Sequence, residues 1–148
     1  MPLLRQTTCN SLAFDMPAKF LGVGWHFPVI KGGEPQHFVA AEYEKSVRQA
    51  ILIILATAKG ERIMRPDFGC GIHELAFAIN DSATRGLAEY EVREALLQWE
   101  PRIEVLQVKA TAAGTQGEKL LVSIDYRVRT TDNRFNLVYP FYLQRGGP

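Results

Sequence analysis

The residues best suited to chemistry are a cysteine and a histidine near the middle of the chain. Cys70 and His73 are both metal-ligand types at close spacing, but a structural zinc needs four ligands and no second pair stands at ligand spacing. The sequence contains no Gly-x-Ser-x-Gly elbow, dinucleotide fingerprint or phosphate-binding loop. It therefore predicts no metal site and no cofactor, and we expect Cys70 to be a small core residue.

Paired carboxylates are the remaining route to catalysis, because a glycosidase needs two acids about 5–10 Å apart, one of them with a raised pKa. The candidate acids are Glu61, Asp67, Glu74 and Asp125. Arg62 and Arg65 flank the first two acids, and neighbouring cations keep a carboxylate ionised instead of raising its pKa. This setting is typical of a salt-bridge network, so the sequence assigns no catalytic residue.

A Glu-Pro-Arg triplet directly after Trp99 suits a binding protein better than an enzyme. In extended chain, residues i and i+2 project from the same side, so Glu100 and Arg102 would face one partner while Pro101 stiffens the link. The alternative is a helix end closed by an internal ion pair, which the sequence alone favours.

The last part of the chain offers a second binding feature, a strand rich in aromatic residues: Phe135, Tyr139, Phe141 and Tyr142. An exposed edge there could accept a strand from another protein. An ordinary protected edge would show the same periodicity, so both readings stay open.

The composition is that of one soluble globular domain. The chain has 148 residues, of which 47% are hydrophobic and 22% charged, and its net charge is +1. Basic residues alternate with acids, so no broad positive field attracts nucleic acid or an anionic membrane. The longest strongly apolar run, residues 50–56, falls far short of the roughly 18 residues that span a bilayer. We expect no nucleic-acid partner, no membrane insertion, and free thiols at both Cys9 and Cys70 in a reducing cytoplasm.

The hydrophobic pattern predicts two helices. Residues 1–19 show no period and are expected to form an irregular arm, followed by a single domain over 20–145. The first helix is expected over 42–58, where apolar residues recur at steps of three and four. A second is expected from N-cap candidates at 80–82 to Trp99, ended by Pro101. Its inward face is predicted to consist of Leu87, Ala88, Val92, Ala95, Leu96 and Trp99.

The remaining segments read as strands and turns. A short strand at 62–64 and a compact turn are expected between the helices. Period-two patterns predict three further strands, with a bulge near Leu106 and an edge strand carrying Pro140. The predicted fold class is α+β, with two main helices packed on a C-terminal antiparallel meander of about three strands.

Four motifs follow one another in a fixed order along the chain. They are FLGVGWHFP at 20–28, GERIMRPDFGC at 60–70, EPR at 100–102 and NLVYPF at 136–141. Together they resemble the small baseplate wedge protein, or sheath initiator, of contractile-tailed phages, a family that includes type VI secretion and extracellular contractile injection systems. The GWHFP form favours a phage tail or an extracellular injection system over a type VI machine.

The resemblance implies a structural, non-enzymatic subunit present in six copies around the tail tube and assembled in the cytoplasm. Its implied partners are the wedge proteins and the sheath subunit, with tube or hub proteins as further candidates. By the same resemblance, Glu100, Pro101 and Arg102 contact the helical core bundle of the wedge proteins.

Two other parts of the chain receive implied roles. A fold-defining turn whose charges line an interface comprises Gly60, Glu61, Arg62, Arg65, Pro66, Asp67 and Gly69. Strands that template the first sheath ring by strand addition carry Val122, Ile124, Tyr126, Val128, Leu137 and Tyr139.

Two competing functions stay open. The first competing function is that of a peptidoglycan-hydrolysing tail protein, because phage members of this family have carried a lysozyme label. It would require an essential Glu61 or Asp67. A stand-alone regulatory module on the same fold is the other, and it predicts a monomer that never enters a large particle.

Overall fold

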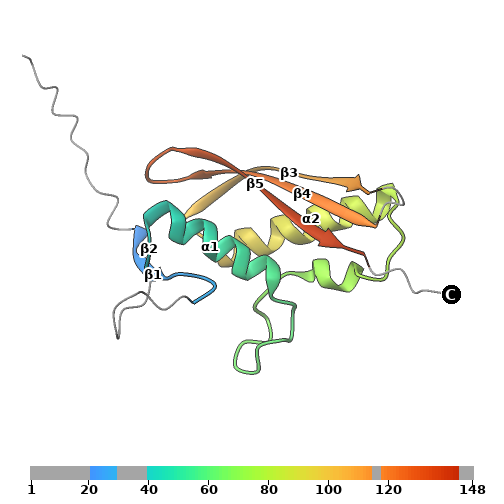
Figure 1. The fold of residues 1–148 in the computed structure, drawn as a ribbon, viewed down its shortest axis with the longest axis horizontal. Helices are drawn as coiled ribbons and strands as arrows, with labels where there is room; N and C mark the ends of the chain where they lie inside the picture. Colours follow the sequence, from blue (N-terminus) through green and yellow to red (C-terminus); the bar gives the residue numbers. More distant parts are fainter. Residues whose placement is uncertain (1–20, 30–39, 115–117, 144–148) are drawn as a thin grey trace, which may run out of the picture.

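Two helices cover one face of a three-stranded antiparallel sheet in the computed structural model, which describes residues 21–29, 40–114 and 118–143 (Figure 1). The elements are β1 (Val23–Trp25), β2 (Ala40–Glu42), α1 (Tyr43–Ala56), the 3-10 helix η2 (Gly71–Leu75), α2 (Ser82–Trp99), β3 (Ile103–Ala113), β4 (Lys119–Val128) and β5 (Arg134–Tyr142). The predicted α+β class is confirmed. The arm expected at 1–19, with Cys9, lies outside the described residues.

Helix α1 forms where the apolar stripe predicted it, although it is shorter at both ends than the expected 42–58. Its buried side chains are Val47, Ile51, Ile54 and Leu55. The helix ends at Thr57, whose backbone N–H and Oγ1 both donate to the carbonyl of Ile53. This closure turns the chain away from the helix axis into the following loop.

Helix α2 begins with a side-chain cap. Oδ1 of Asp81 accepts a hydrogen bond of 2.7 Å from the backbone N–H of Thr84, as expected of an aspartate at this position. The buried stripe consists of Thr84, Ala88, Val92, Ala95 and Leu96. The prediction for Leu87 is wrong, because this residue is 54% exposed. It precedes Ala88 by one position, about 100° around the helix, and so falls outside the stripe.

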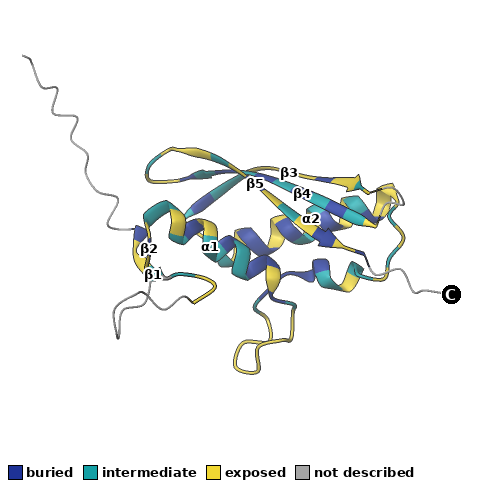
Figure 2. Ribbon diagram, viewed as in Figure 1, coloured by how far each residue is buried: buried dark blue, intermediate teal, exposed yellow. Residues whose placement is uncertain are grey.

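The sheet has the order β3-β4-β5, and β4 is its central strand. Along β4 every second residue is buried against the helices, as the period-two pattern predicted (Figure 2). The register between β3 and β4 shifts between Val105 and Gln107, which confirms the bulge expected near Leu106. β5 is an edge strand, as Pro140 indicated.

Two features between residues 21 and 70 differ from expectation. Val23–Trp25 pairs with Ala40–Glu42 in a small antiparallel ribbon, where only bent extended chain was expected. The strand predicted at 62–64 is wrong: Ile63 and Met64 form a turn in a loop that Gly60 and Pro66 close with a 2.7 Å backbone hydrogen bond. Three residues, Arg62 to Met64, are too few to distinguish a strand from a turn when glycine and proline stand on either side.

None of the helices in the described ranges is long and apolar enough to cross a membrane.

Candidate partner-binding site

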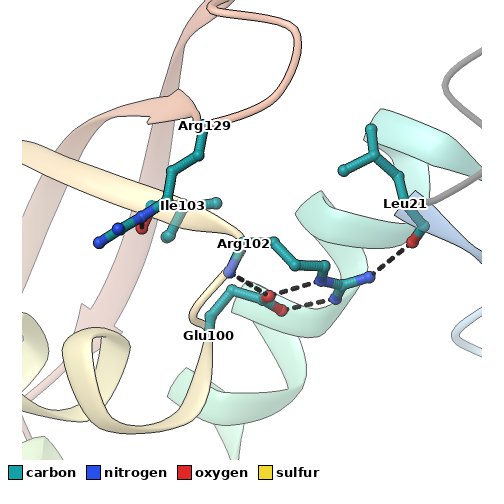
Figure 3. Close-up of polar contacts among 5 residues, drawn as sticks. All are labelled: Leu21, Glu100, Arg102, Ile103 and Arg129. Atoms are coloured by element: carbon teal, nitrogen blue, oxygen red, sulfur yellow. Dashed lines mark hydrogen bonds and ion pairs between the residues drawn. The ribbon is translucent and has the colours of Figure 1, made fainter.

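Glu100 and Arg102 form a buried, two-pronged ion pair where α2 gives way to β3 (Figure 3). Arg102 donates from Nε to Oε1 and from Nη2 to Oε2 of Glu100, each at 2.6 Å. Its Nη1 donates to the carbonyl of Leu21 at 2.9 Å. The Glu100 side-chain hydrogen bonds raise the pKa of Arg102. The internal ion pair, the alternative that the sequence favoured, is therefore present.

The surrounding backbone fixes this turn to several segments of the chain. The N–H of Glu100 donates to the carbonyl of Leu96 in α2 at 3.0 Å, and the backbone N–H of Arg129 donates to the carbonyl of Arg102 at 3.0 Å. Nε of Arg129 also donates to the carbonyl of Ile103 at 3.1 Å. A short turn held at so many points presents its outer residues in one fixed geometry.

The three residues of the motif differ in exposure. Glu100 is 3% exposed, so its carboxylate faces Arg102 and not the solvent. Pro101 is exposed, and one third of the Arg102 side chain remains accessible. A partner at this turn would meet Pro101 and the outer part of Arg102, while Glu100 holds them in place.

The Gly60–Gly69 loop is held by hydrogen bonds at its base and across its tip. Oε2 of Glu61 accepts from the N–H of Ala58 at 2.9 Å, and the N–H of Arg65 donates to Arg62 at 3.2 Å. Gly69 has a φ of +122°, and a Cβ there would lie 2.5 Å from the carbonyl oxygen of Thr57. A side chain at this position would collide with backbone, so the return of the loop requires glycine.

The Gly60–Gly69 loop and the Glu-Pro-Arg turn meet at one cavity of about 360 Å³, which we call the α1–Trp99 pocket. Its lining residues are Ala50, Ile53, Ile54, Arg62, Phe68, Trp99, Glu100 and Arg102. The ring centroids of Phe68 and Trp99 lie 5.1 Å apart, and the guanidinium of Arg62 lies 4.0 Å from the centre of the Phe68 ring. Sequence reasoning placed Trp99 on the inward face of α2 but did not pair it with Phe68, because 31 positions separate the two and no motif links them.

The candidate catalytic acids do not have the protected setting that a general acid requires. Glu61 is exposed and bound to the N–H of Ala58, and Asp67 is exposed 3.6 Å from Arg65. Asp125 accepts a 2.6 Å hydrogen bond from Asn136 on the open face of the sheet.

Cys70 and His73 are both used in packing. Cys70 is fully buried, and burial raises the pKa of its thiol. Nε2 of His73 lies 2.8 Å from the carbonyl oxygen of Leu55, and its ring meets Phe141 edge-on. Over the described segments there is no group of three or more His, Cys, Asp or Glu side chains placed to hold a metal ion.

The strand residues expected to face a sheath lie on the inner face of the sheet. Val122, Ile124, Tyr126, Val128 and Leu137 are buried, and Tyr139 is half-buried against the core. Another protein could meet these strands through backbone at a free edge, but it could not reach these side chains.

The two edges of the sheet differ. On β3 the N–H of Ala110 turns away from β4 and donates to Oε1 of Glu89 on α2 at 2.8 Å, so Glu89 occupies this edge at Ala110. On β5 two backbone hydrogen bonds show which residues pair with β4. The N–H of Val128 donates to the carbonyl of Asn133, and the N–H of Leu143 donates to the carbonyl of Glu118. Odd-numbered residues of β5 therefore bond to β4, and even-numbered residues turn their backbone outward. Pro140 is among the outward residues, where its missing N–H leaves the ladder intact.

Four similarities to known proteins bear on this chain. The family described as baseplate wedge protein gp25 matches residues 41–133, which is more than half of the chain. Baseplate wedge protein gp25 of Enterobacteria phage T4 is 33% identical over 64 residues, covering 43% of this chain and 48% of that protein, so the match spans about half the length of this relative.

Two solved structures are also similar. A Geobacter sulfurreducens protein, provisionally named a tail lysozyme, is 53% identical with a TM-score of 0.67, covering 74% of this chain and 98% of its own. A chain of the six-fold symmetrised anti-feeding prophage baseplate shares the fold at 19% identity and a TM-score of 0.60, covering 83% of this chain and 86% of its own.

Proposed function

Because the chain belongs to the baseplate wedge protein gp25 family, we propose that this structural wedge subunit of contractile tails joins the larger wedge proteins and templates the first ring of the sheath. The family match over 41–133 carries the proposal, since it includes both the Gly60–Gly69 loop and the Glu-Pro-Arg turn. Six copies would ring the tube after assembly in the cytoplasm, in line with the six-fold baseplate that contains a chain of the same fold.

The wedge contact is proposed at Pro101 and Arg102. The buried bond to Glu100 fixes the Arg102 side chain before any partner arrives. Binding then loses little conformational entropy at this point, because the geometry of the turn is set by the fold. In this role Glu100 is a positioning residue and does not itself touch the partner.

Sheath templating is proposed at the β5 edge. Glu89 occupies the edge of β3 at Ala110, whereas β5 turns the backbone of residues 134, 136 and 138 outward. An added strand would gain several backbone hydrogen bonds at once, in a register set by alternate side chains. Pro140 would limit the added strand at one end.

The wedge contact can be tested by co-expressing the chain with the wedge proteins from its own locus and purifying the complex. We expect the wild type to co-purify, and Pro101→Glu, which leaves the ion pair in place, to lose the complex while keeping the wild-type circular dichroism. Glu100→Ala/Arg102→Ala removes both charges and should also fail to assemble. A wild-type chain that stays alone with every wedge protein would contradict the proposal.

The β5 edge can be tested with proline. Val138→Pro removes an outward N–H and no bond to β4, so the fold should survive while sheath assembly on purified baseplates is lost. Ala112→Pro makes the same change at an outward position of β3 and should leave assembly unchanged. Equal sheath assembly by both variants would exclude β5 as the template.

A hydrolase is the second candidate, because the Geobacter relative is provisionally named a tail lysozyme. We propose that this chain acts without catalysis, since neither Glu61 nor Asp67 is shielded from water. Purified wild-type protein should not clear peptidoglycan in a turbidity assay. Clearing that disappears in both Asp67→Asn and Glu61→Gln would establish the hydrolase instead.

A further inference from the structure

The α1–Trp99 pocket combines an apolar floor with the cation of Arg62 at its rim. Ile53 and Ile54 of α1 meet the rings of Phe68 and Trp99 across the floor. Arg102, also at the rim, already donates to Glu100 and Leu21. Such a hollow would hold an aliphatic or aromatic side chain supplied by another molecule.

Arg62 is the rim residue whose side chain has no ion-pair partner among the described residues. Its guanidinium carbon lies over the Phe68 ring, 4.0 Å from the ring centre, and its side chain makes no hydrogen bond or ion pair within the described part of the chain. A cation–π contact with the ring leaves the N–H groups of the guanidinium available, and these groups can bind a carboxylate in two-pronged geometry.

The tip of the Gly60–Gly69 loop continues the same surface with apolar side chains. Ile63 is 94% exposed and Met64 is 90% exposed. The two arginines beside them fold back onto aromatic rings, Arg62 on Phe68 and Arg65 on Trp99. Charged residues are thus withdrawn from the tip and apolar residues project from it, the reverse of an ordinary solvated loop.

We propose that the α1–Trp99 pocket binds an acidic, amphipathic segment of a neighbouring wedge protein. An apolar side chain of the segment fills the floor, and a carboxylate beside it pairs with Arg62. Ile63 and Met64 pack along the flank of the same segment. This inference rests on the proposed function and adds the chemistry of the partner to the turn at Pro101 and Arg102.

Charge reversal and pocket filling test the two halves of the inference separately. Arg62→Glu should weaken binding to the purified wedge complex from the same locus by about tenfold or more, measured by biolayer interferometry. Ala50→Phe places a ring in the cavity from the partly exposed side of α1 and should weaken binding to a similar degree. Both variants should unfold at the wild-type temperature within a few degrees.

Matched controls use exposed residues of α2. Arg93→Glu makes the same charge change at a residue that lines a different cavity, and Ala83→Phe adds the same ring at the first turn of the helix. Both should bind within about twofold of the wild type. A reversal of one Asp or Glu to Lys on the wedge protein should restore binding to Arg62→Glu, which a purely structural role of Arg62 would not produce.

The outcomes separate this inference from the function on which it rests. Wild-type affinity in Arg62→Glu and Ala50→Phe, alongside lost binding in Pro101→Glu, would refute the acidic segment and leave the wedge contact standing. A wild-type chain that binds no wedge protein would remove both. Sedimentation with phosphatidylglycerol vesicles that Arg62→Glu abolishes would overturn the inference in favour of a membrane.

Discussion

Removing Arg102 alone should cost as much stability as removing both members of the Glu100–Arg102 pair. In Arg102→Ala the carboxylate of Glu100 stays buried at 3% exposure and loses both of its 2.6 Å hydrogen bonds. Breaking a buried pair from one side costs about 3–5 kcal/mol. One third of the Arg102 side chain reaches water, so the lower end, about 3 kcal/mol, applies here.

Glu100→Ala should lower the free energy of unfolding by less than Arg102→Ala does, and the double variant should lower it by less than the sum of the two single variants. Glu100→Ala leaves an arginine that can turn toward water and still donate to Leu21, for about 1–2 kcal/mol. The double variant leaves no unpaired buried charge and loses the Leu21 bond, the 3.4 Å bond from the backbone N–H of Arg102 to Glu100 and some packing, for about 2–3 kcal/mol in total. The coupling energy between the two residues is then about 1–3 kcal/mol.

Urea unfolding at pH 7, followed by circular dichroism, measures all four free energies of unfolding. The comparison holds if the dependence on urea concentration is the same in each protein. Glu100→Gln is a useful control, because it removes the charge and keeps a hydrogen-bond acceptor of the same shape. Additive costs, or a loss below about 1 kcal/mol in Arg102→Ala, would show that the pair is neither buried nor coupled as the structure has it.

Three further predictions concern the fold that carries the site. Gly69→Ala should lower the free energy of unfolding by about 1–3 kcal/mol, because its Cβ meets backbone at positive φ. Gly86→Ala, in open space on α2, should raise the free energy of unfolding by about 0.5–1 kcal/mol. Urea unfolding compares the two variants, and a Gly69→Ala protein as stable as the wild type would contradict the collision. In a Cys9→Ser background, the buried, raised-pKa thiol of Cys70 should react with Ellman's reagent only in denaturant, and rapid native labelling would show that the core opens there. The Asp81 cap has a pKa lowered by its hydrogen bonds to Thr84, so its stabilisation is present above the ordinary value of 3.8 and is lost as the pH falls through the lower folded value. The stability gap to Asp81→Ala should therefore be constant near neutral pH and narrow as the pH falls below 3.8, and a gap that stays constant in acid would refute the charged cap.

The helices and the three-stranded sheet could be predicted because their burial follows a regular period. The buried stripe of α1 and the alternation along β4 both follow directly from spacing. Even the bulge near Leu106 is visible as a slip in phase. Leu87 was misplaced because the solvent face of α2 also carries large apolar residues, so the sequence marks two faces and only the packed structure selects one.

The site was less accessible to sequence reasoning than the fold. The ion pair between Glu100 and Arg102 could be seen as an alternative, because the two charges stand two positions apart in a turn. The α1–Trp99 pocket could not, since its walls come from α1, the Gly60–Gly69 loop and the end of α2. Its existence depends on Phe68 packing against Trp99, a contact that no spacing rule specifies.

Fold and partner contact depend on the same residues at this pocket, which affects how loss of assembly must be interpreted. Arg102 holds Leu21 and Glu100 in the core while its outer part faces the proposed partner. A variant at Arg102 can therefore lose assembly either through unfolding or through a lost contact. The side chain of Arg62 makes no polar bond in the described part of the chain, and a change at Pro101 leaves the ion pair intact. Changes at these two positions therefore alter the surface with little effect on the core. If assembly responds to them while stability does not, the buried pair serves the partner by holding this surface rigid, and the contact itself belongs to its exposed neighbours.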